Sequence, residues 1–139
     1  MAYQDPQSAI GFVQASTSFA STDQYCLVKF STTTNAAPGD IRISDTQGEF
    51  CNGVLDDLGA ETSGSACRVV IGGLTKFRVS TTHAAIAVNT ILYSGGAGTV
   101  HTATSSGYYP VGYALEAVAA DTTAIIAGVF IQSLNQRTT

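Results

Sequence analysis

Few side chains in this chain have the types and spacing that catalysis or metal binding requires. The two histidines, His83 and His101, lie in stretches rich in Ser and Thr and belong to no HxH, HExxH or His-rich cluster. The three cysteines, Cys26, Cys51 and Cys67, form no CxxC pair and are odd in number, which disfavours both a zinc site and a disulfide framework. We therefore expect solvated histidines, and reduced cysteines that pack as small apolar side chains in the core.

The other candidate sites are equally weak. Asp56 and Asp57 are adjacent, so their side chains diverge, and no DxDxDG pattern supports calcium binding. The glycine-rich run at 95–98 lacks the Lys-Ser/Thr ending of a phosphate-binding loop, and no GxSxG motif marks a nucleophilic serine. We assign no catalytic residue and expect neither a metal nor a cofactor. An enzyme stays an alternative only if His83, His101 and the acids meet in the folded chain.

The composition favours a protein that assembles with others. The net charge of −4 and a pI near 4.8 argue against a nucleic-acid partner, which would require clustered Lys and Arg. Only 12% of the residues are charged, so much of the surface must consist of Ser, Thr, Asn, Gln and Gly. The N-terminal sequence has no secretory signal, and the apolar run at 124–131 is too short to span a bilayer, so we expect no membrane partner.

The segments that must position these residues have the pattern of short β-strands joined by polar turns. Strands are predicted at 25–31, 40–44, 53–55, 66–71 and 90–94, and the glycine-rich run at 95–98 is predicted to be a hairpin turn. No segment has a convincing helical pattern. We therefore predict an all-β fold, a small β-barrel or β-sandwich of short antiparallel strands with an extended N-terminal arm.

The last third of the chain carries the strongest strand signal. One set of residues alternates with Gly112, Ala114 and Glu116 and is expected to be the buried face of a strand: Val111, Tyr113, Leu115 and Ala117. After a turn at 120–122, the run at 124–131 has no polar side chain, so both of its faces are expected to meet apolar neighbours. This predicts a central strand or a subunit contact.

The chain is divided into an N-terminal arm at 1–24, a β-domain at 25–134 and a C-terminal tail at 135–139. The arm contains Ile10, Phe12, Val13 and Phe19 among many small polar residues. It is either a frayed terminus or an extended strand that adds to the sheet edge of a neighbouring subunit.

Two glycines, Gly72 and Gly73, predict a hairpin with a three-residue loop at 72–74, which pairs Val69 with Phe77 and Cys67 with Val79. On the other face this register gathers three basic residues, Arg68, Lys76 and Arg78. Nearby acids (Asp56, Asp57 or Glu61) fold back to neutralise them, or a partner supplies the acid.

Over residues 25 to 131 the chain contains six motifs in this order: LVKFS, GVL, CRVVIGGLTKFRV, ILYSGGAGTVHTA, YPVGYALEAV and IIAGVFI. With these motifs in this order, it resembles the small capsid decoration, or cement, proteins of tailed bacteriophages. The resemblance implies a compact β subunit that assembles as a homotrimer on the outer capsid surface, contacts the major capsid protein and stabilises the shell. Such a protein is synthesised in the host cytoplasm and becomes part of the virion. The candidate interface residues are Ile10, Phe12, Val13, Phe19, Arg68, Lys76 and Arg78.

A second hypothesis is a carbohydrate-binding or receptor-binding β module of a phage fibre. Its stacking platforms would be four tyrosines, Tyr93, Tyr108, Tyr109 and Tyr113. Both hypotheses are non-enzymatic.

Overall fold

The computed structural model describes residues 8–14, 18–32, 39–56, 65–132, 135 and 137. These residues contain one 3-10 helix, η1 (Ser21–Asp23), and are otherwise β-strands and loops, so the predicted all-β fold is confirmed. The strands are β1 (Ser8–Gln14), β2 (Leu27–Phe30), β3 (Ile41–Ile43), β4 (Gly53–Leu55), β5 (Ala66–Arg78), β6 (Ile91–Gly96), β7 (Thr99–His101), β8 (Pro110–Ala114) and β9 (Ile125–Phe130). No helix in these ranges is long and apolar enough to cross a membrane.

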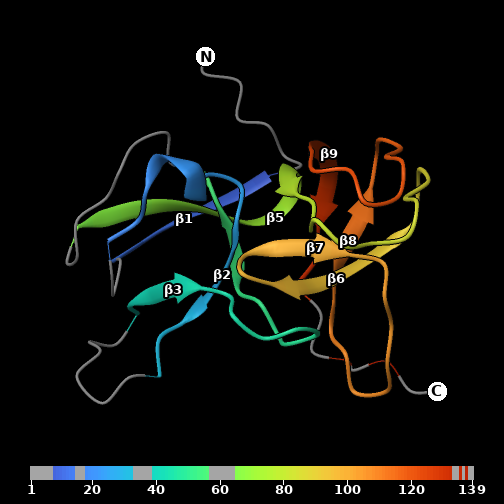
Figure 1. Ribbon diagram of the computed structural model, residues 1–139. Helices are drawn as coiled ribbons and strands as arrows, with labels where there is room; N and C mark the ends of the chain where they lie inside the picture. The colour runs from blue at the N-terminus through green and yellow to red at the C-terminus, as the bar shows by residue number, and fades with distance from the viewer. Residues whose placement is uncertain are drawn as a thin grey trace.

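The strands form one antiparallel sheet in the order β3-β2-β4-β5-β9-β8-β6-β7, with β1 paired to β5 (Figure 1). The sheet curls, because the turn after β6 returns to its other end. Gly98 O accepts a hydrogen bond from Leu27 N at 2.7 Å, and Gly98 N donates to Ser44 O at 2.7 Å. These two bonds satisfy backbone groups that an open sheet edge would leave exposed.

The hairpin predicted at 72–74 is wrong. Residues 66 to 78 form one long strand, β5, which bends without reversing direction (Figure 1). Before the bend it pairs with β1 and β4, and after the bend it pairs with β9, so Val69 lies opposite Leu55 and Phe77 lies opposite Ile126. Gly73 has φ +88°, a conformation that glycine adopts without strain and that serves a bend as well as a turn.

The bend changes which face of β5 points into the main core. Val70 before the bend and Phe77 after it both belong to this core, although they are separated by an odd number of positions. Cys67 and Val69 face a second, smaller cluster instead. That cluster also contains Phe19, Val28, Ile41 and Leu55. The two apolar runs of the predicted hairpin therefore support two different cores.

The C-terminal strand β9 is central, as predicted, since it pairs with β5 on one side and β8 on the other. Only one of its faces is fully covered, because Ile126 and Phe130 are buried while Ile125 is exposed. The alternation predicted for β8 is wrong. Val111 and Ala114 are buried, whereas Leu115 lies beyond the strand and is exposed. A register shift between β6 and β8 breaks the simple period of two.

The described part of the predicted arm lies against its own chain. Strand β1 pairs antiparallel with β5, from Ser8 opposite Gly73 to Gln14 opposite Ala66. Phe19 follows and is 2% exposed within the second cluster. Strand addition therefore takes place within one molecule here. The extension of the arm to a neighbouring subunit stays a prediction.

Candidate interaction surface

One apolar row crosses the outside of the sheet on four adjacent strands. Val129 on β9 lies opposite Leu74 on β5 and Tyr113 on β8, and Tyr113 lies opposite Ile91 on β6. Residues directly opposite one another on paired strands point to the same face. Leu74 is 41% exposed and Ile91 is 54% exposed, so the row opens to solvent at both ends.

A second row continues the same face. Ala127 on β9 lies opposite Lys76 on β5, and its carbonyl oxygen accepts a hydrogen bond from Leu115 N at 2.9 Å. Ile125 follows opposite Arg78. We call the apolar members of these rows the outer apolar face: Leu74, Ile91, Tyr113, Leu115, Ile125, Ala127 and Val129.

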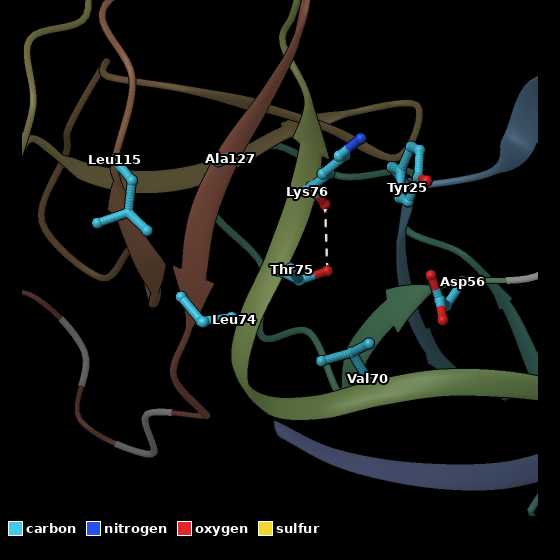
Figure 2. Close-up of a pocket in the computed structure, with 8 residues that line it drawn as sticks. All are labelled: Tyr25, Asp56, Val70, Leu74, Thr75, Lys76, Leu115 and Ala127. Carbon is cyan, nitrogen blue, oxygen red and sulfur yellow. Dashed lines mark hydrogen bonds between the residues drawn. The ribbon is translucent and has the colours of Figure 1, made fainter. Parts of the chain in front are cut away.

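A groove of about 380 Å³ borders this face in the bend of β5 (Figure 2). Val70 lines it before the bend, and Leu74 and Lys76 line it after the bend. The Lys76 ammonium lies 5.5 Å from the centroid of the Tyr25 ring, within the range of a cation–π contact. The groove therefore has apolar residues on its floor and Lys76 at its rim, and Asp56, the ion-pair partner of Arg68, also lines it.

The three basic residues that the wrong hairpin would have gathered have different partners. Arg68 forms a 2.5 Å ion pair with Asp56, so an acid of the same chain does fold back onto it as expected. Arg78 donates from Nε to Gln24 O at 2.8 Å. Within the described residues Lys76 forms no ion pair. In the same part of the chain Arg78 forms no ion pair either, since Gln24 O is a neutral acceptor, so the charges of Lys76 and Arg78 are both left for a partner.

A charged network holds the turn after β3 against the sheet. Glu49 pairs with Lys29 and accepts hydrogen bonds from Ser44 Oγ at 2.7 Å and from two backbone N–H groups, those of Asp45 and Thr46. Burial favours a higher pKa for Glu49, but these donors outweigh burial and hold the pKa below its ordinary value. The network is structural, because its polar atoms satisfy one another.

The histidines are buried, so the expectation that they would be solvated is wrong. His83 is 7% exposed, and its Nδ1 and Nε2 lie 2.6 Å and 3.1 Å from the carbonyl oxygens of Ala84 and Thr122. His101 is 2% exposed and lies 2.8 Å through Nε2 from the side-chain amide of Gln47. Burial lowers the pKa of His101. His83 is held by loop carbonyl groups and His101, at the end of β7, by the side chain of Gln47, and such contacts leave no motif in the sequence.

The cysteines are free and buried, as expected. Burial raises the pKa of Cys26 and of Cys51 to about 11, so both thiols stay protonated at neutral pH. The described residues contain no cluster of His, Cys, Asp and Glu able to hold a metal ion.

The four tyrosines do not form one platform. Tyr93 is 5% exposed and packs with Tyr108 at a centroid distance of 6.2 Å, while Tyr109 meets Phe50 edge to face at 5.6 Å. Tyr113 lies apart from them in the outer apolar face. Of the four rings only that of Tyr93 is buried, and the other three are half-buried at different places on the surface.

Comparison with known proteins identifies the family. A family model described as "Phage cement protein" matches residues 21–129. The chain belongs to the phage cement protein family. No curated protein matches it. A solved structure, "head fiber gp8.5 N base in bacteriophage phi29", is similar with a TM-score of 0.56 and 19% identity, covering 91% of this chain and 96% of the other. At that identity the likeness concerns the fold.

Membership of the cement family makes the chain a structural protein associated with a phage capsid, as the sequence resemblance predicted. The cement-family match begins at η1, so β1 lies before the matched region. In β1, Ile10, Phe12 and Val13 lie opposite Val70, Arg68 and Cys67. The structure thus brings these three positions beside β5.

Phe19, the remaining apolar residue among the predicted interface positions, has almost no surface to offer a partner because it is 2% exposed. The interface roles of the predicted residues stay predictions. Sequence reasoning missed Leu74, Ile91, Leu115 and Ile125 as surface residues of this cement-family chain. The patterns predicted apolar neighbours for Leu115 and Ile125 and placed Leu74 in a hairpin loop, and only the pairing of strands shows that they share an open face.

Proposed function

We propose that this chain decorates the outer surface of a bacteriophage capsid and stabilises the shell by bridging neighbouring capsomers as a homotrimer. The match to the phage cement protein family over residues 21–129 carries the proposal. The major capsid protein is the partner, and the chain acts through contacts, without enzymatic activity. It is made in the host cytoplasm and becomes part of the virion.

The surface of the chain supports this role. Four of its exposed apolar side chains gather on one side of the sheet: Leu74, Ile91, Leu115 and Ile125. Large exposed apolar patches mark interaction sites. Modest contacts repeated over a symmetric shell add up to strong attachment, because linked subunits bind with an increased effective concentration.

The arm supplies a further contact in this proposal. Within the residues that the structure describes, strand β1 pairs with β5 only, so its other edge would be open to an extended segment of a neighbour. Ile10, Phe12 and Val13 on β1 would then lie at the junction between subunits or between the subunit and the major capsid protein.

The test adds purified protein to expanded capsids that lack it. We expect the protein to co-sediment with the capsids and to raise the temperature or chelator concentration at which they break. Capsids that bind none of it, or that bind it without gaining resistance, would refute the proposal. An acidic β protein of similar mass serves as the control for non-specific adsorption.

A further inference from the structure

We propose that the outer apolar face binds a second copy of this chain, and that Lys76 of each copy pairs there with Glu116 of the next. This rests on the homotrimer of the proposed function and assigns its interface. The inference depends on the shape of the face, the exposure of its side chains and the placement of Lys76 and Glu116.

The face has the composition of a contact between identical subunits. Its exposed members include Ile91 at 54%, Ile125 at 44% and Leu115 at 36%. The members of the face lie on four neighbouring strands or, for Leu115, directly after one of them, which gives a continuous surface. The cores of homo-oligomer interfaces are richer in apolar area and poorer in charge than the rest of a protein surface.

Two opposite charges lie on either side of Ala127. Lys76 lies opposite it on β5, and Glu116, which follows β8, accepts a hydrogen bond from Ala127 N through Oε2 at 2.6 Å. Lys76 and Glu116 are both exposed, and within the described residues neither forms an ion pair. Each therefore has charge available for a group outside the chain.

This arrangement suits a closed ring of three copies. Around a three-fold axis, a surface with a cation on one side of an apolar strip and a carboxylate on the other places the cation of each copy against the carboxylate of the next, which is a head-to-tail contact. The charges then select partner and orientation, while the apolar strip supplies the buried area. A partner of a single sign of charge would satisfy only one of the two residues, so a second copy fits better than an acidic or a basic surface.

The apolar part is tested with Leu74→Asn combined with Ile91→Asn. Both side chains are more than 40% exposed, so the fold should tolerate the changes. Light scattering after size exclusion is expected to give about three times 14.3 kDa for the unchanged chain. The variant should dissociate at concentrations roughly ten-fold or more above those that dissociate the unchanged chain, since interface anchors commonly carry that much binding energy.

A matched control removes an equally exposed apolar residue elsewhere. Phe30 on β2 is 49% exposed and lies outside the outer apolar face, so Phe30→Asn should leave the mass unchanged. Circular dichroism of each variant confirms that the chain is folded before its mass is compared.

The charged part is tested by exchanging the two charges. Lys76→Glu and Glu116→Lys should each weaken association, because each places like charges together. The double exchange should restore most of it. Glu116→Gln keeps an oxygen that can accept from Ala127 N and removes only the charge, which separates the interface role from the local hydrogen bond.

A monomeric unchanged chain would overturn the inference, as would folded Leu74→Asn/Ile91→Asn protein that keeps its full mass. A double charge exchange that fails to recover association would overturn the assigned pair. Capsid addition is measured separately. A chain that stabilises capsids while its mass is insensitive to these changes retains the proposed function and loses this interface, and loss of capsid binding at unchanged mass would mean that the face contacts the shell.

Discussion

The ring of Phe77 on β5 fills the space that a side chain at Gly128 on β9 would need. A Cβ at position 128 would lie 2.5 Å from Cε2 and 2.6 Å from Cδ2 of this ring. Phe77 is completely buried. The close approach of the two strands in the main core thus depends on the absence of a side chain at Gly128.

Gly128→Ala should destabilise the fold by about 1 to 3 kcal/mol, because the rigid ring must shift within a packed core. Urea unfolding followed by circular dichroism measures the change. Gly72→Ala is the matched control, since a Cβ at Gly72 meets nothing within 4 Å. Equal stability of the two variants would contradict the packing described here.

Removing the carboxylate of Glu49 should cost about 1 to 3 kcal/mol, because Lys29 and two backbone N–H groups lose their acceptor. The test compares Glu49→Ala with Asp45→Asn in urea unfolding. The Asp45 side chain is 54% exposed, so its ion pairs with Lys29 and Arg42 are worth much less. A larger loss for Asp45→Asn would show that the network is centred elsewhere.

Stability should fall with acidification in two stages. Burial lowers the pKa of His101 below 6.5, so the unfolded chain binds the proton more readily and stability decreases as the pH falls below about 6.5. Glu49 has a pKa below its ordinary value of 4.5, so its contribution is complete above that pH and is lost as the pH falls through the folded-state pKa.

The two stages are separable by substitution. His101→Gln should remove the first stage and Glu49→Gln the second, in thermal melts recorded between pH 7 and pH 3. A melting temperature that rises on acidification would contradict the predicted effect of both His101 and Glu49.

Phe19→Ala should destabilise the isolated chain by about 3 to 5 kcal/mol, the usual cost of emptying a buried aromatic site. Phe19 packs in the second cluster with Val28 and Leu55, where it is 2% exposed. Chemical unfolding of the purified protein gives this value. If the variant folded as stably as the unchanged chain but failed to assemble, Phe19 would belong to an interface, as the sequence suggested, and not to the core.

Local sequence signals determined most of the strand positions. The hairpin between β2 and β3, strand β4 and the glycine-rich turn between β6 and β7 lie where the pattern predicted them. In that last turn Ala97 has φ +49° and Gly98 has φ +74°, the left-handed conformations that a two-residue hairpin turn requires. Such turns depend on residues close together in sequence, so the sequence alone can specify them.

The bend at Gly72 and Gly73 shows where local reasoning ends. A glycine pair permits a turn and permits a bend, and the choice depends on which distant strands pair with the residues on either side. Val69 meets Leu55 and Phe77 meets Ile126, contacts that join segments far apart along the chain. The same long-range pairing buries His83 and His101 and leaves Leu74 and Ile91 exposed.

The sequence by itself thus determined the all-β class, the reduced cysteines and the cement-family resemblance, because these follow from composition, spacing and short motifs. The tertiary structure alone decided the register of β5, the burial of the histidines and the gathering of the outer apolar face. A side chain is buried or exposed according to the strands that pack over it, and that packing is settled by the whole sheet at once.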